Sequence, residues 1–109
     1  MHELGIAQEI VEIACGQSHG ARVKRIVVQI GKLSAVLPEA VRFCFDLCTE
    51  GTSAAGAELE IIEPTGVARC RMCDGQVLLD RPFGQCPCGS TDLEWLSGEE
   101  LKIQMVEVA

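Results

Sequence analysis

The sequence predicts an α+β fold in which two helices pack against a small three-stranded sheet that carries an inserted cysteine-rich subdomain. Three observations predict it. Two stretches repeat their apolar residues at helical spacing, and three stretches alternate apolar with polar residues as strands do. Between the second and third of those strands lies a segment that holds four of the seven cysteines. At 109 residues, the chain has room for one small domain with an appendage.

The two helices are expected over residues 4–17 and 38–51. In the first, the apolar residues recur at 3.6-residue spacing and share one face: Ile6, Ala7, Ile10, Ile13 and Ala14. The second opens with Pro38, a residue type that suits the first turn of a helix. Cys44 and Cys48 fall on its apolar stripe, and we interpret them as buried thiols that behave as small hydrophobes.

The three strands are expected over residues 23–31, 58–63 and 99–108. Ile26 alternates with Val28 along the first of them, which places both on one face. The last stretch alternates in the same way, so we expect it to return to the sheet that the first strand begins. The predicted order of elements is therefore α–β–α–β–insert–β.

Residues 65–97 differ in composition from the rest of the chain. They include four cysteines and four glycines but few large apolar side chains. Such a segment cannot bury enough apolar surface to fold alone, so we expect a bound metal to hold it together. The predicted division is an α+β domain, residues 1–64 plus 98–109, and a metal-binding insert, residues 65–97.

Composition and charge exclude several classes of protein. The formal charge of −7 disfavours a protein that wraps a nucleic-acid backbone. No apolar run approaches the roughly 18 residues of a membrane span, and the N-terminus lacks the basic and apolar regions of a signal peptide. We therefore expect a cytoplasmic protein without nucleic-acid or membrane partners. In that compartment, cysteines are thiols or metal ligands rather than disulfides.

The cysteine spacing predicts a tetrahedral zinc site. Cys70 and Cys73 are separated by two residues, and Cys86 and Cys88 follow after twelve more. Soft thiolate ligands favour zinc over magnesium or calcium. Four thiolates fill the coordination of zinc, so the site would hold structure without activating water. We therefore expect the inserted subdomain to resemble a zinc ribbon. We do not expect the chain to be an enzyme.

The second cysteine pair departs from the usual spacing, because Pro87 alone separates its members. Closing these two sulfurs onto one metal requires a bend at Pro87, Cys88 and Gly89. An iron–sulfur cluster and a redox-active dithiol stay open as alternatives at this point. Nucleic-acid binding is disfavoured because the ribbon carries few cations: Arg69, Arg71 and Arg81.

The N-terminus begins Met-His-Glu, which offers several nitrogen ligands in a short space. The α-amine of Met1, the amide nitrogen of His2 and its imidazole can form fused chelate rings, and nitrogen ligands in a plane suit Ni(II) or Cu(II). The amide of Glu3, its carboxylate or a partner protein can supply a fourth ligand. A histidine at position 2 strains a fully planar set, so the site should release its metal readily. The alternative is that His2 is an exposed terminal residue without a role.

These features together resemble the HypA/HybF family of nickel-insertion accessory proteins for [NiFe]-hydrogenase maturation. The resemblance rests on MHE, the order of elements, GTSAAGAELEI, the paired cysteines followed by GS, and GEELKIQMVEV. It implies nickel at His2 with Glu3 beside it, and zinc at the four cysteines. The family usually has two residues between the second pair of cysteines, so the Cys86–Cys88 pair departs from its pattern.

The resemblance also implies partners. Members of the family deliver Ni(II) to the hydrogenase large-subunit precursor together with the GTPase HypB, and some serve urease accessory proteins. The competing hypotheses are a small zinc-ribbon adaptor that binds proteins but no nickel, a thiol redox protein that uses Cys70 and Cys73, and a hydrolase with an open zinc. The sequence leaves open whether the chain forms a homodimer. Since nickel binding needs a neutral imidazole and a deprotonated amine, affinity should fall between about pH 8 and pH 6.

Overall fold

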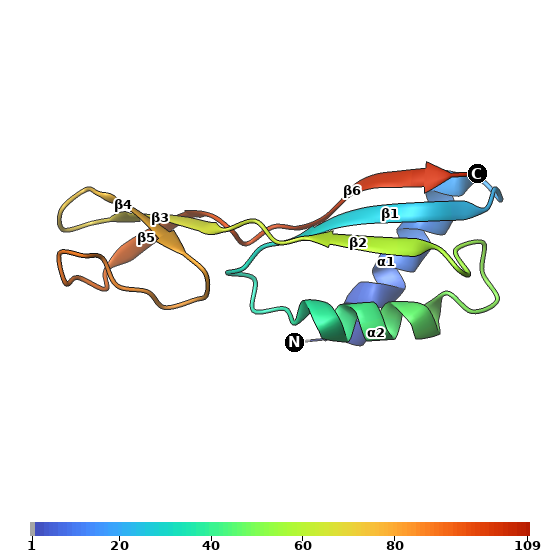
Figure 1. Ribbon diagram of the computed structural model, residues 1–109, viewed down its shortest axis with the longest axis horizontal. Coiled ribbons are helices and arrows are strands. Elements are labelled where there is room, and N and C mark those ends of the chain that lie inside the picture. The colour runs from blue at the N-terminus through green and yellow to red at the C-terminus, as the bar shows by residue number, and fades with distance from the viewer. Residues whose placement is uncertain (1) are drawn as a thin grey trace. The chain divides into compact units, whose positions relative to one another are not determined.

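The computed structural model describes residues 2–109 (Figure 1). Two helices and six strands follow one another along this part of the chain: α1 (Glu3–Ser18), β1 (Val23–Ile30), α2 (Pro38–Cys48), β2 (Glu58–Ile62), β3 (Gly66–Cys70), β4 (Gln76–Leu79), β5 (Leu93–Ser97) and β6 (Leu101–Val108). They form two compact units. The helical unit comprises residues 2–29, 36–62 and 102–109, and the ribbon unit comprises residues 30–35 and 63–101.

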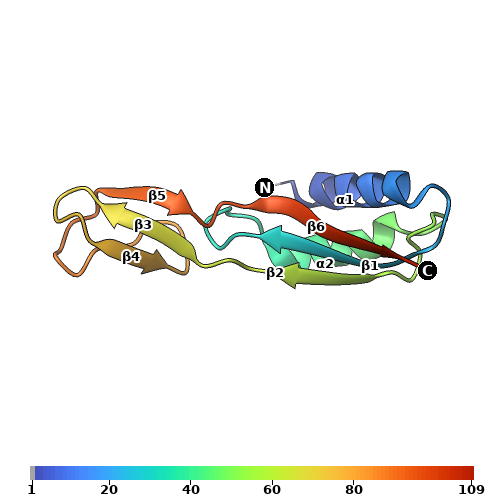
Figure 2. The same ribbon diagram turned by 90° about the horizontal axis from the view of Figure 1, so that it is seen from above.

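The helical unit contains a three-stranded sheet with the order β2-β1-β6. β1 pairs with β2 in parallel, and α2 provides the crossover between them. β6 runs antiparallel on the other side of β1, where the backbone N–H of Ala109 donates to the carbonyl of Arg22 (Figure 2). This arrangement confirms the predicted fold class of two helices against a small three-stranded sheet.

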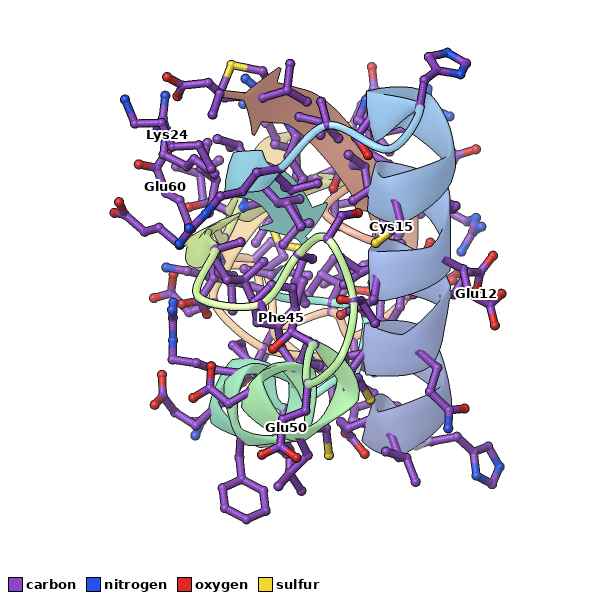
Figure 3. All side chains as sticks on the ribbon, turned by 90° about the vertical axis from the view of Figure 1, so that its right-hand side faces the viewer. Glu12, Cys15, Lys24, Phe45, Glu50 and Glu60 are labelled. Atoms are coloured by element: carbon purple, nitrogen blue, oxygen red, sulfur yellow. The ribbon has the colours of Figure 1, made fainter. Side chains whose placement is uncertain are left out.

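The helices of this unit pack on each other and on one face of the sheet (Figure 3). β1 is the central strand, and its side chains Ile26 and Val28 are almost fully buried. Val41 and Phe45 of α2 are buried as well, 0% and 1% exposed. Removing these apolar side chains from water is the main stabilising contribution to the unit. Neither α1 nor α2, the helices of the described chain, is long and apolar enough to cross a membrane.

The buried stripe of α1 differs from the predicted one, most clearly at Ile13. Ile13 is 40% exposed, whereas Val11 is 5% exposed. The buried residues follow the spacing i, i+3, i+4, i+7, i+11: Ala7, Ile10, Val11, Ala14 and Ser18. Ile13 lies well to the side of this line on a helix of 3.6 residues per turn. The expectation that Ile13 shares the buried face is therefore wrong. Val11, which was not predicted to be buried, lies on the line of buried residues instead.

The ribbon unit contains a second three-stranded sheet with the order β4-β3-β5. Both neighbours of β3 run antiparallel to it, and the pairing with β5 is irregular between Val67 and Ala68. Its core is small, and two cysteines take part in it: Leu33, Ala68, Cys70, Val77, Leu79 and Cys86, with Leu93 and Trp95 packed against them. A core this small contributes little to the free energy of unfolding, so a bound metal would supply a large share of the stability of the ribbon unit.

Leu33 belongs to this core although it lies between β1 and α2, far from the other core residues in sequence. Its side chain is 3% exposed, and its backbone N–H donates to the carbonyl of Gly98 at 2.8 Å. Gly66 leaves space for it, because a Cβ there would come within 2.5 Å of a Leu33 methyl carbon. Gly98 has a φ of +111°, which a residue with a side chain rarely adopts. The ribbon is thus completed by a residue from the loop before α2.

Candidate metal centre

The four cysteines that the sequence singled out lie together at one end of the ribbon unit. The ligand atoms of Cys70, Cys73, Cys86 and Cys88 are all within 4.8 Å of one another. Cys70 ends β3 and Cys73 follows it, whereas the second pair comes from the loop between β4 and β5. Cys70 and Cys86 are buried in the core, and Cys73 and Cys88 are exposed.

The distances between these sulfurs fit a tetrahedral zinc site. The Sγ atoms of Cys70 and Cys88 are 3.7 Å apart, and those of Cys73 and Cys86 are 3.6 Å apart. Zinc–sulfur bonds of about 2.3 Å in a tetrahedron place neighbouring sulfurs about 3.8 Å apart. A disulfide, in contrast, joins its sulfurs at about 2.05 Å. Each close pair takes one cysteine from each motif, so the four sulfurs enclose a single position for a metal.

Backbone hydrogen bonds shape the first cysteine motif. The N–H of Cys70 donates to the carbonyl of Gly75, and the N–H of Asp74 donates to the carbonyl of Cys70, both at 2.8 Å. Asp74 adopts a φ of +63°, a conformation that aspartate tolerates better than most residues. The turn directs the N–H groups of Cys73 and Met72 at the Cys70 sulfur.

The second motif closes in the way that its short spacing requires. The N–H of Gly89 donates to the carbonyl of Cys86 at 2.8 Å, and the N–H of Cys86 donates to the carbonyl of Ser90 at 2.9 Å. Gly89 has a φ of +100°, so the reversal directly after Cys88 depends on a glycine. The expected bend is present, and a spacing of one residue still brings both sulfurs into the cluster.

The surroundings of the cysteine cluster shift the pKa values of two of its thiols in opposite directions. The backbone N–H of Cys73 is the main reason that the pKa of Cys70 falls to about 6. A backbone N–H of Cys88 also favours the thiolate of Cys86, but burial and protons shared with neighbouring thiols outweigh it and raise the pKa of Cys86 to about 12. Four thiolates this close repel one another, and a bound dication removes that repulsion.

Surface ion pairs neutralise two of the ribbon's arginines. Arg69 binds Glu94 at 2.7 Å and Asp74 at 3.1 Å. Arg71 binds Asp92 at 2.9 Å. Exposed pairs of this kind add little stability, but they leave these arginines without surplus charge for a phosphate backbone.

The predicted nickel ligands lie at the start of α1, in the helical unit. His2 is the N-cap residue of α1; its side chain is exposed and makes no capping hydrogen bond. Its backbone carbonyl accepts the first helical hydrogen bond, from Ile6 at 3.1 Å. Met1, the third predicted ligand, lies outside the described residues. The imidazole of His2 is therefore presented to solvent at the end of a well-formed helix.

Glu3 makes a contact that the sequence did not reveal. Its Oε2 accepts a hydrogen bond from the backbone N–H of Leu37 at 3.0 Å. Leu37 is the N-cap residue of α2 and offers no polar side chain for capping. The carboxylate of Glu3 thus stabilises the start of the neighbouring helix, where negative charge is favoured. This hydrogen bond is the main reason that the pKa of Glu3 lies below its ordinary value.

Comparisons with known proteins cover essentially the whole chain. A family model described as "Hydrogenase/urease nickel incorporation, metallochaperone, hypA" matches residues 1–108. A hydrogenase maturation factor HypA from Nostoc punctiforme is 55% identical over 108 residues, which cover 99% of this chain and 96% of the relative. A protein of the same description from Geotalea uraniireducens is 41% identical, with 99% of both chains covered.

Solved structures share the fold. The solution structure of the Ni metallochaperone HypA from Helicobacter pylori matches with a TM-score of 0.65 at 21% identity, covering 99% of this chain and 97% of that one. A second solution structure of a HypA protein matches with a TM-score of 0.59 at 20% identity. At these identities, the structures show a common fold of the whole chain.

Proposed function

Since the chain belongs to the HypA family of hydrogenase/urease nickel-incorporation metallochaperones, we propose that it carries Ni(II) to the [NiFe]-hydrogenase large-subunit precursor during maturation. It acts without catalysing a reaction, and Ni(II) is its cargo. The GTPase HypB is the proposed co-worker, urease accessory proteins are further candidate recipients, and the cytoplasm is the proposed location. The observation that supports this proposal is the position of His2 at the start of α1, where its imidazole is exposed and makes no capping hydrogen bond.

The helix start leaves further ligands available beside that imidazole. The first backbone N–H groups of an α-helix have no partner within the helix. The amide of His2 is one of them, so its deprotonation on nickel binding would break no helical hydrogen bond. Glu3 uses Oε2 for Leu37, which leaves Oε1 as the candidate for the metal. His2, Glu3 and the α-amine of Met1 are thus the proposed nickel ligands.

The cysteine cluster serves a structural role in this proposal. Cys70, Cys73, Cys86 and Cys88 are the proposed zinc ligands, and four thiolates leave no position for a reactive water. Two of them are also core residues of the ribbon unit. Bound zinc would therefore fold the ribbon and neutralise its thiolates, which supports a carrier with a fixed shape and no enzymatic activity.

A genetic experiment tests the delivery step. A host that lacks its own copy of this protein is supplied with the wild type or with His2→Ala, and hydrogenase activity is measured at low and at high external nickel. We expect the wild type to restore activity at low nickel and His2→Ala to fail there, with partial recovery at high nickel. Equal activity of both proteins at low nickel would contradict the proposal and favour the zinc-ribbon adaptor.

A further inference from the structure

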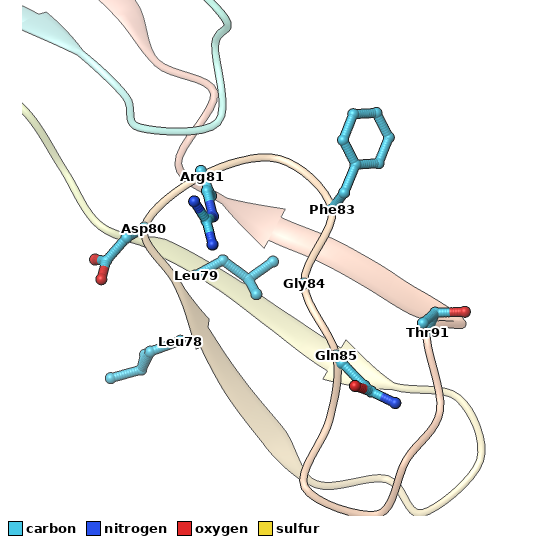
Figure 4. A pocket seen from close by; sticks show the side chains of 8 residues that line it. All are labelled: Leu78, Leu79, Asp80, Arg81, Phe83, Gly84, Gln85 and Thr91. Atoms are coloured by element: carbon cyan, nitrogen blue, oxygen red, sulfur yellow. The ribbon is translucent and has the colours of Figure 1, made fainter.

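A cleft on the ribbon unit is not used by the cysteine cluster. It has a volume of about 700 Å³ and lies against the loop that leads from β4 to Cys86 (Figure 4). Leu78 and Leu79 of β4 contribute to its wall, and Arg81 and Phe83 of the loop line it as well. The side chain of Leu79 faces the loop, whereas that of Leu78 points away from it (Figure 4).

The backbone of Phe83 adopts a left-handed conformation that is energetically unfavourable for this residue type. Its φ is +68°, a left-handed value that strains a residue with a large side chain. Its ring is 91% exposed, and Figure 4 shows it standing out from the loop. Strained residues concentrate at binding sites, where the surrounding structure holds them in place. An occupant that covers the ring would bury this apolar surface.

The loop is fixed in place rather than loosely exposed. Gly84 lies directly on Leu79, because a Cβ at position 84 would overlap a methyl carbon of that leucine. Leu79 is itself 6% exposed and part of the ribbon core. The backbone next to Phe83 therefore packs against the ribbon core. The ring of Phe83 projects away from this contact (Figure 4).

Arg81 is the unpaired cation of the ribbon unit. The other three cations of this unit are in ion pairs: Lys32 with Asp80 at 3.3 Å, Arg69 with Glu94 and Asp74, and Arg71 with Asp92. Arg81 is exposed and has no hydrogen-bond or ion-pair partner among residues 2–109. The one acidic residue of the cleft, Asp80, is already neutralised by Lys32. The cleft thus carries a positive charge on a chain whose formal charge is −7.

From these observations we infer that the cleft binds a segment of a partner protein in which an apolar side chain lies next to a carboxylate. The planar guanidinium of Arg81 suits a carboxylate through paired hydrogen bonds. The exposed ring of Phe83 supplies the adjoining apolar contact. A single free cation is too little for a nucleic acid. The inference concerns the ribbon surface alone and does not depend on nickel binding.

The test uses a defined peptide as the probe. Zinc-loaded, ¹⁵N-labelled protein is titrated with acetyl-Gly-Leu-Glu-Leu-Gly-amide and, separately, with the same peptide carrying Gln for Glu. We expect saturable shifts of the Phe83 and Gly84 amide signals and of the Arg81 Nε–H. The dissociation constant should be at least about fivefold higher for the Gln peptide, since a charge-assisted hydrogen bond is lost. Arg81→Gln should weaken binding of the Glu peptide by a similar factor, and Phe83→Ser should weaken both peptides.

Leu96→Ser is the matched control, because Leu96 is 57% exposed on β5 and does not line the cleft. It should leave binding unchanged, and equal zinc content in all variants shows that the ribbon is intact. Equal binding of both peptides, or no saturable shift at the cleft, would overturn the inference. So would concentration-dependent shifts without peptide that vanish in Phe83→Ser, since the face would then pair with a second copy of the chain.

Discussion

The carboxylate of Glu3 accepts a hydrogen bond from the backbone N–H of Leu37 at 3.0 Å and so joins the start of α1 to the start of α2. The residue proposed to stand beside His2 at the nickel site is therefore also a residue that orders the helices. These two roles, metal ligand and helix contact, can be separated by substitution.

Two variants of Glu3 separate them. Gln keeps an oxygen that can accept from Leu37 but removes the negative charge, whereas Ala removes both. We expect Glu3→Gln to weaken nickel binding by several-fold and to lose only the part of the thermal stability that depends on the negative charge, and Glu3→Ala to lower both, stability by more. Calorimetric titration and thermal unfolding of the two proteins check this. If Glu3→Gln binds nickel like the wild type, Glu3 is a helix contact and not a ligand.

The pH dependence of nickel binding should come from the nitrogen ligands and not from Glu3. Imidazole and amine must lose protons, so affinity should fall from about pH 8 to pH 6. The pKa of Glu3 is lowered by Leu37, so this carboxylate stays ionised throughout that range. Nickel titrations at several pH values should therefore give curves of the same shape for wild type and Glu3→Gln. A flat wild-type curve would rule out the N-terminal site.

The same lowered pKa predicts an effect at acid pH. A carboxylate whose pKa is depressed by folding stabilises the folded state fully above the unfolded pKa, about 4.3 for glutamate. This contribution is lost as the pH falls through the lower value of the folded state. Comparing acid unfolding of wild type and Glu3→Gln, which lacks the titration, measures it. The stability difference between the two should shrink below about pH 4, and a constant difference would contradict the assignment.

Removing zinc should unfold the ribbon unit and spare the helices. Trp95 is the chain's one tryptophan and packs against the core that contains Cys70 and Cys86. A strong chelator should therefore shift its fluorescence to longer wavelength, while the far-ultraviolet circular dichroism of α1 and α2 changes little. Adding zinc back should reverse the shift. Fluorescence that is unaffected by complete zinc removal would show that the ribbon folds without a metal.

Leu33 should contribute to ribbon stability despite its place in the loop before α2. Its side chain is 3% exposed, so Leu33→Ala leaves a cavity in a small core and should cost about 2–5 kcal/mol. Leu37→Ala is the matched control four residues away, because Leu37 is 66% exposed. Denaturant unfolding followed by Trp95 fluorescence compares them. Equal stability of the two variants would exclude Leu33 from the ribbon core.

The sequence predicted both helices, the strands β1, β2 and β6, and the cysteine cluster, because these depend on local patterns, whereas the three strands of the ribbon unit were not predicted. Apolar periodicity placed both helices, and the spacing of Cys70, Cys73, Cys86 and Cys88 was enough to foresee a common site. The roles of Leu33 and Leu37 could not be foreseen, because each depends on a contact with a segment distant in sequence. Residues 32–37 form a short loop without periodicity, so no local signal marks Leu33 as a core residue of the ribbon.

The most direct test of the proposed carrier is a nickel titration of untagged protein, wild type beside His2→Ala, with zinc measured in the same samples. A tag would extend the chain at Met1 and remove its free amine, so the native N-terminus is essential. The account predicts one zinc in each protein, one nickel bound by the wild type and none by His2→Ala. Equal nickel binding by both proteins, or binding by neither, would contradict the assignment of nickel to the N-terminus.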